Sequence, residues 1–452
     1  MGTKTGRGLP PGPKGLPVVG VMPQMAKDPL NFLLSRSREY SHVFQLRPGW
    51  FFMYQPEEVK QVLQSNWSNY QKGASITPLK AGLGDGLITS EGELWLRQRR
   101  LAQPAFHSHR VAGLVDAMAR AASQMAERWN RRIGETLEFS AEMRRVTLDI
   151  VGRALFSRSM DEVADDFAEA IAIGMDITNR RFFSLLPIPY TWPTPQNRRF
   201  DRAMTVLNRV VFDIIADRRE KLDGAPEDLL TMLMTARDEA TGEGMSDQQL
   251  RDECMTLLIA GHDSTSQSLC WTFYMLATHP EVAEKLRGEI DRVVGQRPVQ
   301  FSDLSQLTYA TMVVREVLRL YPTAWLMSRS PSQDDEISGF SVPGGSVILM
   351  SPFVTHRHPE IWHEPEQFIP ERFEESRFAE KHKFAFWPFG GGPRLCIGNQ
   401  FSIHESLVVL VTALQRFSMR LIPDQRIELE PRITIRPRYG IKFELGARTA
   451  QC

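Results

Sequence analysis

Apolar residues recur at intervals of three and four through the middle of the chain, from about residue 91 to 295. Leu207, Val210 and Ile214 are one such set. This spacing is typical of helices that bury one face. The longest uninterrupted pattern runs over 247–278. The sequence therefore predicts a mainly α-helical body with one long central helix.

Short apolar stretches bounded by turn residues lie toward the two ends of the chain. They predict strands over 43–46 and 51–54, with a helix from Pro56, and later strands over 337–340 and 346–350. A closing hairpin is expected from 432–435 and 440–445. The predicted fold class is a large helical body with small β-sheets in the N-terminal and C-terminal regions.

Residues 10–20, PPGPKGLPVVG, combine prolines that restrict the backbone with glycines that allow turns. We expect this segment to lie extended against a neighbouring element, although a linker is an equally good interpretation. The chain has 452 residues, which is long for one domain. A helical fold around a large cofactor can keep that length in one core, so length alone leaves the domain count open.

The 54 basic and 54 acidic residues balance, and this argues against nucleic acid as a partner. No run approaches the ~18 apolar residues that a membrane span requires, and the polar start lacks the apolar core of a signal peptide. A soluble protein is expected. A removed membrane anchor would leave the same polar start, so the origin of the N-terminus stays open.

The four cysteines do not suggest a disulfide framework. Cys254 and Cys270 fall on one predicted helix, where they would be about 24 Å apart, too far to form a bridge. Cys452 ends the chain and Cys396 lies in a glycine-rich loop. This usage favours a reducing compartment, and the cytoplasm is the expected location.

Cys396 stands among four glycines and a proline, just before an apolar helix predicted over 400–414. Backbone N–H groups and the helix dipole at such a position favour the thiolate. Glycines also let the backbone approach a flat ligand closely. For an isolated cysteine, a structural role in a buried turn would be the better interpretation.

The surrounding residues change that interpretation. Phe389, Gly392, Arg394, Cys396 and Gly398 match every specified position of F-x-x-G-x-R-x-C-x-G. This segment resembles the haem-binding signature of the cytochrome P-450 family. The resemblance implies haem b (iron protoporphyrin IX) as cofactor, Cys396 as the iron ligand, and cofactor contacts from Phe389 and Arg394.

Two further segments resemble structural motifs of the family. Glu316 and Arg319 fit its E-x-x-R motif, and Arg372 lies in the later Pro-Glu-Arg-Phe segment over 370–373. The resemblance implies that these three charges form a buried cluster behind the cysteine loop. Taken alone, the i, i+3 pair would be an ordinary surface pair.

Trp95 and Arg99 fit the family's W-x-x-x-R segment, and Arg329 precedes the late strands. The resemblance implies that these residues, with Arg394, bind the haem propionates. Arginine suits that role because its planar fork donates two hydrogen bonds to one carboxylate. A basic surface helix is the alternative for the segment around Trp95.

The centre of the long helix carries an unusual polar run, His262 to Ser268, after Gly261. Glycine and short hydroxyl side chains weaken a helix, so a local kink with room for water is expected. The alternative is a bent helix whose polar groups bond internally.

This run resembles the family's A-G-x-[DE]-T-T pattern beside the oxygen site. Asp263 matches the acid that supplies protons. Ser264 replaces the usual threonine and Thr265 follows it, so either hydroxyl is a candidate for the relay. His262 falls at a variable position and no catalytic role is expected for it.

The motifs run in the family's order through nearly the whole chain, which implies a single haem domain over 1–452. The haem would lie buried between the long central helix and the helix after the cysteine loop. Residues 1–20 would form a polar, proline-rich N-terminal segment. The implied function is monooxygenation of an apolar small molecule by O2, such as a fatty acid, terpenoid or polyketide.

The expected pocket residues are those after Gly73, Ala260, residues 323–327 and Ile433. Electrons would come from a separate ferredoxin, flavodoxin or flavoprotein reductase, and the protein would be a monomer. Positive charge for that partner would come from Arg97, Arg99, Arg100 and Arg110.

Two other functions remain alternatives. One is a haem-thiolate peroxygenase, isomerase or dehydratase that needs no reductase, and the other is a non-catalytic haem sensor or electron carrier. Asp263 and the hydroxyls beside it argue against the first, since such relatives commonly lose that relay. A non-catalytic haem sensor or electron carrier would have no need for a polar helix centre beside an apolar pocket.

Overall fold

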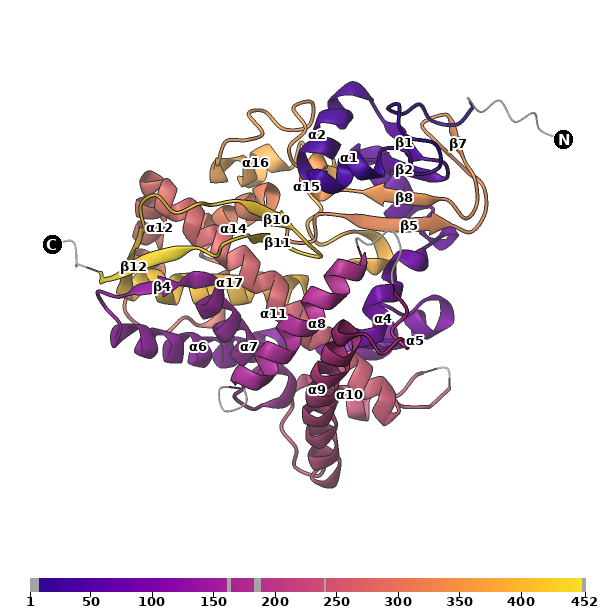
Figure 1. Ribbon diagram of the computed structural model, residues 1–452. Helices are drawn as coiled ribbons and strands as arrows, with labels where there is room; N and C mark the ends of the chain where they lie inside the picture. The colour runs from indigo at the N-terminus through magenta and orange to yellow at the C-terminus, as the bar shows by residue number, and fades with distance from the viewer. Residues whose placement is uncertain (1–7, 161–163, 183–187, 240, 449–452) are drawn as a thin grey trace. The chain divides into compact units, whose positions relative to one another are not determined.

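The computed structural model describes residues 8–160, 164–182, 188–239 and 241–448 (Figure 1). Cys452 lies outside them. The chain divides into two compact units. Unit 1 contains Met1–Ser75, Arg315–Cys396 and Pro431–Ile435, and unit 2 contains Ile76–Val314, Ile397–Glu430 and Arg436–Cys452.

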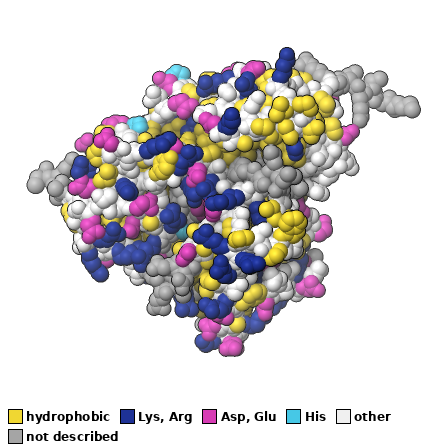
Figure 2. Space-filling model, in the orientation of Figure 1, with side chains coloured by type: hydrophobic (Ala, Val, Ile, Leu, Met, Phe, Trp, Pro, Cys, Tyr) yellow, Lys and Arg dark blue, Asp and Glu magenta, His cyan; other side chains and the backbone are white. Residues whose placement is uncertain are grey.

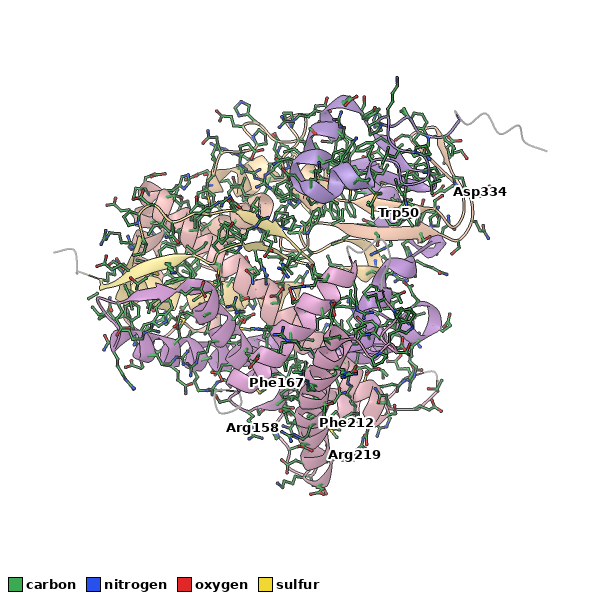
Figure 3. The ribbon with its side chains drawn as sticks, in the orientation of Figure 1. Trp50, Arg158, Phe167, Phe212, Arg219 and Asp334 are labelled. Atoms are coloured by element: carbon green, nitrogen blue, oxygen red, sulfur yellow. The ribbon has the colours of Figure 1, made fainter. Side chains whose placement is uncertain are left out.

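The centre of unit 1 is a five-stranded sheet with the order β1-β2-β8-β5-β3. Its strands are β1 (Val43–Arg47), β2 (Trp50–Met53), β8 (Val347–Met350), β5 (Met327–Pro331) and β3 (Tyr70–Gln71). Only the β2–β8 pair is parallel. The sheet buries Phe51, Met53, Ile348 and Met350 in one hydrophobic cluster. Trp50, labelled in Figure 3, stands at the start of β2. The Cζ atom of Arg47 lies 4.2 Å from the centre of the Trp50 ring.

The proline-rich segment lies along β1, as predicted. The Gln45 amide donates to the carbonyl of Pro11 at 2.7 Å, and the Val21 amide donates to Leu46 at 3.0 Å. Gly20 adopts φ +56°, and a Cβ there would lie 2.1 Å from the Leu46 carbonyl oxygen. The segment therefore covers the edge of the sheet, which would otherwise present unpaired backbone groups.

The other elements of unit 1 are short. They are α1 (Met22–Lys27), α2 (Pro29–Glu39), α3 (Pro56–Lys60), the π-helix η1 (Gln61–Ser65), η2 (Trp67–Asn69), β6 (Asp335–Ile337), β7 (Phe340–Val342), α15 (Pro352–Thr355), η5 (Pro370–Phe373), α16 (Glu375–Phe378), η6 (Lys383–Ala385) and η7 (Gly392–Arg394). The helix predicted from Pro56 is thus α3 continued by η1.

Unit 2 is built from helices. They are α4 (Thr77–Leu83), α5 (Gly92–Ala102), η4 (Gln103–Phe106), α6 (Ser108–Asn130), α7 (Phe139–Phe156), α8 (Ala164–Phe182), α9 (Pro195–Glu220), α10 (Leu229–Thr235), α11 (Asp247–Thr278), α12 (Pro280–Val293), α13 (Phe301–Leu304) and α17 (Asn399–Arg416). Helix α14 (Thr308–Leu320) and η3 (Gly73–Ile76) each cross a unit boundary. In Figure 1, α8 and α9 run side by side, in agreement with their contacts.

The long central helix has the bounds that its pattern predicts. It begins after Ser246, whose side chain accepts from the Gln249 amide, while the Gln249 side chain accepts from the Ser246 amide. This reciprocal capping fixes the first turn. Helix α11 packs against α7, α9 and α17, so most of its residues are buried. Unit 2 is therefore organised around α11.

One predicted strand and the predicted closing hairpin are wrong. Residues 337–340 do not form one strand, because Ser338 (φ +50°) and Gly339 (φ +79°) make the turn between β6 and β7. The closing hairpin is also absent from the described chain, since β12 (Lys442–Ala447) pairs with β4 (Thr136–Glu138) and β9 (Phe417–Leu421). Residues 432–434 separate β10 (Leu429–Pro431) from β11 (Ile435–Pro437), which pair with each other. Alternating apolar residues mark an extended segment without specifying its partner.

Among the described residues, no helix is both long enough and apolar enough to cross a membrane.

Candidate functional site

The three cysteines in the described part of the chain have different environments. Cys254 and Cys270 are buried in α11, and desolvation raises the pKa of both thiols, that of Cys270 to about 12. Cys396 is exposed. Of these three, only Cys396 is placed to present sulfur to a ligand, because the others are enclosed and strongly favour the neutral thiol.

The loop that carries Cys396 is held tightly within unit 1. A Cβ at Gly392 would lie 1.8 Å from the Leu63 carbonyl oxygen, and one at Gly391 would lie 2.3 Å from the ring of Phe384. The Cys396 amide donates to the Phe389 carbonyl at 3.0 Å and closes the loop. The glycines therefore let the backbone lie directly against η1 and η6, while the cysteine side chain faces outward.

Three other predicted cofactor-binding residues belong to unit 1. Phe389 and Arg394 are half-buried in the same loop as Cys396. Arg329 is half-buried on β5, where one guanidinium nitrogen donates to the Ser328 carbonyl at 2.8 Å. Each of these three residues is thus only partly enclosed by the protein.

The E-x-x-R motif forms the buried charge cluster that the resemblance implies. Glu316 and Arg319 have fully buried side chains, and their closest contact is 2.7 Å. Arg372 donates to the same carboxylate at 3.0 Å, and Arg319 also donates to the carbonyls of His356 and Pro365. The alternative of a surface pair is wrong. Buried charges with several partners stabilise one arrangement of the chain around them.

Helix α5 of unit 2 carries Trp95, which is buried, and Arg99, which is half-buried. Between them lies Gln98, which is fully buried, although neither polar atom of its amide has a hydrogen-bond partner among the described residues. A buried amide without partners is costly, so this position suits a polar ligand group. Gln98 was not predicted as a site residue; its place inside the W-x-x-x-R segment was the available signal.

The basic residues expected to attract a redox partner are largely engaged within unit 2. Arg97 donates to the Gly244 carbonyl at 2.7 Å, Arg100 pairs with the buried Asp238 at 2.9 Å, and Arg110 pairs with Glu227 at 2.6 Å. Figure 2 likewise shows basic and acidic side chains interspersed on the face in view. These pairs reduce the positive field that Arg97, Arg100 and Arg110 could offer.

The centre of α11 is open on one side. Ala260, Gly261, Asp263 and Ser264 are half-buried, whereas the residues from Thr265 to Thr272 are buried. The Ser264 hydroxyl donates to the Ala260 carbonyl at 2.7 Å. This bond satisfies the hydroxyl within its own helix. Helix α11 remains continuous at this point. The open strip places an acid and a hydroxyl beside accessible space.

Thr265 faces a different direction from Ser264. Its hydroxyl lies 3.1 Å from that of Ser402 on α17. Glu405, one turn further along α17, is also buried, and desolvation holds its pKa well above the usual range. Thr265 therefore belongs to the packing between α11 and α17.

His262 is a structural residue. Its Nδ1 lies 3.1 Å from the hydroxyl of Thr147 on α7, and the same hydroxyl donates to the His262 carbonyl. Burial lowers the pKa of His262 to about 4. The imidazole is therefore neutral near pH 7 and joins α11 to α7.

The family model for cytochrome P-450 matches residues 10–444. Cyclooctatin synthase from Streptomyces melanosporofaciens is 36% identical over 94% of this chain and 92% of its own length. Pentalenene oxygenase from Streptomyces avermitilis is 30% identical over 97% of both chains. The crystal structure of the haem domain of cytochrome P-450DA superposes with a TM-score of 0.89 at 28% identity, covering 98% of this chain and 97% of that one.

The chain belongs to the cytochrome P-450 family. It is an oxidoreductase of the monooxygenase type, and the family binds haem. Each unit, taken by itself, carries residues that fit that cofactor. Unit 1 presents an exposed thiol on a closely held loop. Unit 2 carries on α5 a buried amide without a hydrogen-bond partner among the described residues, and half-buried residues at the centre of α11.

Proposed function

We propose that this protein uses haem b to insert one oxygen atom from O2 into a C–H or C=C bond of an apolar terpenoid. The thiolate of Cys396 would hold the haem iron. The observation that carries the proposal is the exposure of Cys396 on a loop whose glycines pack directly against Leu63 and Phe384. A sulfur held in this way keeps its position when the ligand binds.

The residues that would hold the haem come from the W-x-x-x-R segment, from the cysteine loop and from β5. Trp95 and Arg99 on α5, with Arg329 and Arg394, would hold the haem propionates, and Phe389 would contact the macrocycle. Three guanidinium groups suit two carboxylates, because each offers a planar pair of donors. Gln98 is a further donor, which would satisfy its buried amide. When bound, the haem supplies the iron that activates O2, with the thiolate favouring cleavage of the O–O bond.

Asp263 and Ser264 carry protons to the oxygen site. Both lie on the open strip of α11, so water can reach them. Asp263 releases a proton, and the Ser264 hydroxyl passes it on while it accepts another. That step requires the Ser264 side chain to turn away from the Ala260 carbonyl, which it contacts at 2.7 Å. Thr265 has no part in the relay, because its hydroxyl is committed to Ser402.

The substrate is expected to be apolar because the pocket candidates are mostly apolar. Ala260, Leu326, Met327 and Ile433 are each half-buried, so each retains surface for a ligand. Two relatives are named cyclooctat-9-en-7-ol 5-monooxygenase and carotene epsilon-monooxygenase, at 34% and 29% identity. These names favour a terpenoid over the fatty-acid and polyketide alternatives.

The remaining parts of the proposal concern the setting of the protein. The whole chain acts as one haem domain, in agreement with a family match that extends through residues of both units. The protein works as a cytoplasmic monomer. Its electrons come from a separate ferredoxin, flavodoxin or flavoprotein reductase.

The test combines a spectrum with a product analysis. Reduced protein treated with carbon monoxide should show the long-wavelength band of thiolate-ligated haem. With a ferredoxin, its reductase, NADPH and O2, a set of cyclic terpenes should yield products that carry one atom from labelled O2. Turnover with hydrogen peroxide alone, and none with the reductase, would instead establish a peroxygenase. A protein without the carbonyl band would refute the proposal.

A further inference from the structure

A buried network of charges joins α11 to the segment that follows α4. Arg251, Asp252 and Glu253 are consecutive on α11 and only 6%, 5% and 0% exposed. Arg251 contacts Asp252 at 2.9 Å and donates to the Gly82 carbonyl at 2.9 Å and to the Asn208 side chain of α9 at 2.8 Å. One arginine thus connects α11 with two other parts of the fold.

The two carboxylates bind the backbone of the turn after α4. Asp252 accepts from the Asp85 amide at 2.9 Å, and Glu253 accepts from the Leu87 amide at 3.2 Å. Charged acceptors give stronger hydrogen bonds than neutral ones. The turn is therefore fixed at two alternate residues by groups that cannot move without exposing a buried charge.

Glycines bring this turn into direct contact with α11. A Cβ at Gly84 would lie 2.2 Å from the Asp252 carboxylate, and one at Gly86 would lie 2.1 Å from the Thr256 hydroxyl and 2.6 Å from the Asp252 carbonyl oxygen. No larger residue fits at Gly86 unless the turn moves away from the helix. The lack of space at the two glycines and the hydrogen bonds to the two carboxylates therefore each hold the turn against α11.

The turn lies next to the open strip of α11. Asp252, Thr256 and Ala260 follow one another at intervals of four residues, so they share one face of the helix. Ala260 lies one turn beyond Thr256, or about 6 Å along the axis. Ala260 is half-buried and begins the strip that includes Asp263 and Ser264. The network that holds residues 84–87 therefore also holds one edge of the space beside the open strip of α11.

We propose that Arg251, Asp252 and Glu253 are positioning residues that hold residues 84–87 as a rigid wall of the substrate pocket, and so determine which large ligands fit. This inference rests on the proposed function only in taking the ligand of the pocket to be the substrate of the enzyme. The network sets the wall before any ligand binds. Arg251 orients the Asp252 carboxylate through their 2.9 Å contact.

Hydrogen exchange tests the wall without haem chemistry. In Asp252→Ala and Glu253→Ala, the protection of the Asp85 and Leu87 amides should fall by about tenfold or more, because their acceptors are gone. Asp252→Asn and Glu253→Gln keep an acceptor oxygen and should retain most of it. Asp247→Asn is the matched control, since Asp247 is exposed on the same helix and pairs with Arg219. Unchanged exchange in both alanine variants would overturn the proposal.

Two imidazoles of different size test the effect on the pocket. Imidazole needs only the iron, whereas 1-dodecylimidazole must also fill the pocket. Gly86→Ala, which keeps every charge, should change the Kd of 1-dodecylimidazole by about tenfold and that of imidazole by less than about twofold. Equal changes for both probes, or none, would contradict the inferred wall. If a variant lacks the carbonyl band, that result bears on the proposed function and not on the wall. The hydrogen-exchange data still show whether the network holds residues 84–87.

Discussion

The loop around Cys396 and the centre of α11 are both unusual in sequence, yet they reach their conformations differently. The loop has few side chains, and its shape follows from glycines that let the backbone contact Leu63 and Phe384. The centre of α11 is rich in polar side chains, and the packing of α7 and α17 decides where each one points. Backbone constraint can be recognised from residue types, whereas the direction of a side chain depends on its neighbours.

The largest effect is expected at the loop. Cys396→Ser should abolish the long-wavelength carbonyl band, because a serine hydroxyl does not replace a thiolate ligand. Cys270→Ser is the matched control, since this cysteine is buried in α11. Absorption spectra of the reduced, carbon monoxide-treated proteins measure the outcome. A normal band in Cys396→Ser would remove the ligand assignment.

The cluster behind the loop should come next. Arg319→Ala leaves Glu316 buried without its main partner, and the free energy of unfolding should fall by about 3–5 kcal/mol. Urea unfolding and the haem content after purification measure this effect. Arg377→Ala is the control, because its partner Glu374 is exposed. Equal stability of the two variants would show that the cluster contributes little to the fold.

On α11, the buried His262 predicts a dependence of stability on pH. Its folded pKa of about 4 lies below the ordinary value of 6.5, so the unfolded chain binds the proton more readily. The contribution of the neutral ring is complete above about pH 6.5 and is lost as the pH falls toward 4. The free energy of unfolding should fall by about 3 kcal/mol in total through this one group.

Urea unfolding from neutral pH to about pH 4 tests this prediction. In His262→Gln the loss of stability on acidification should be smaller than in the natural protein, because glutamine has no proton to bind. His363→Gln, at a side chain that is 91% exposed, should behave like the natural protein. Parallel curves for all three proteins would assign the acid sensitivity to other groups.

The smallest effects should separate the two hydroxyls of α11. Ser264→Ala should consume reductant but divert it to hydrogen peroxide, and the product formed per NADPH should fall by about tenfold. Thr265→Ala and Ser402→Ala break the same contact, so each should cost about 1 kcal/mol of stability and leave the coupling unchanged. The ratio of product to reductant decides between the hydroxyls. A loss of coupling in Thr265→Ala alone would assign the relay to Thr265.

Much of this protein could be predicted from sequence because local constraints carried the information. The periodicity over 247–278 gave the bounds of α11, since an apolar stripe and a capping serine act within a few residues. The spacing of Glu316, Arg319 and Arg372, together with the resemblance, anticipated the buried cluster. Cys396 stood out because glycines and a following helix have a direct physical meaning.

Other features were decided only by contacts between distant segments. Strand β12 pairs with β4 and β9, and short strands do not specify their partners. Arg97, Arg100 and Arg110 found partners well over 100 residues away, in Gly244, Asp238 and Glu227. The sequence pattern did not single out Arg251, Asp252 and Glu253, whose network joins α11 to residues 82–87 and to α9. The direction of a side chain and the partner of a charge depend on which segments pack together, and that is a property of the tertiary structure.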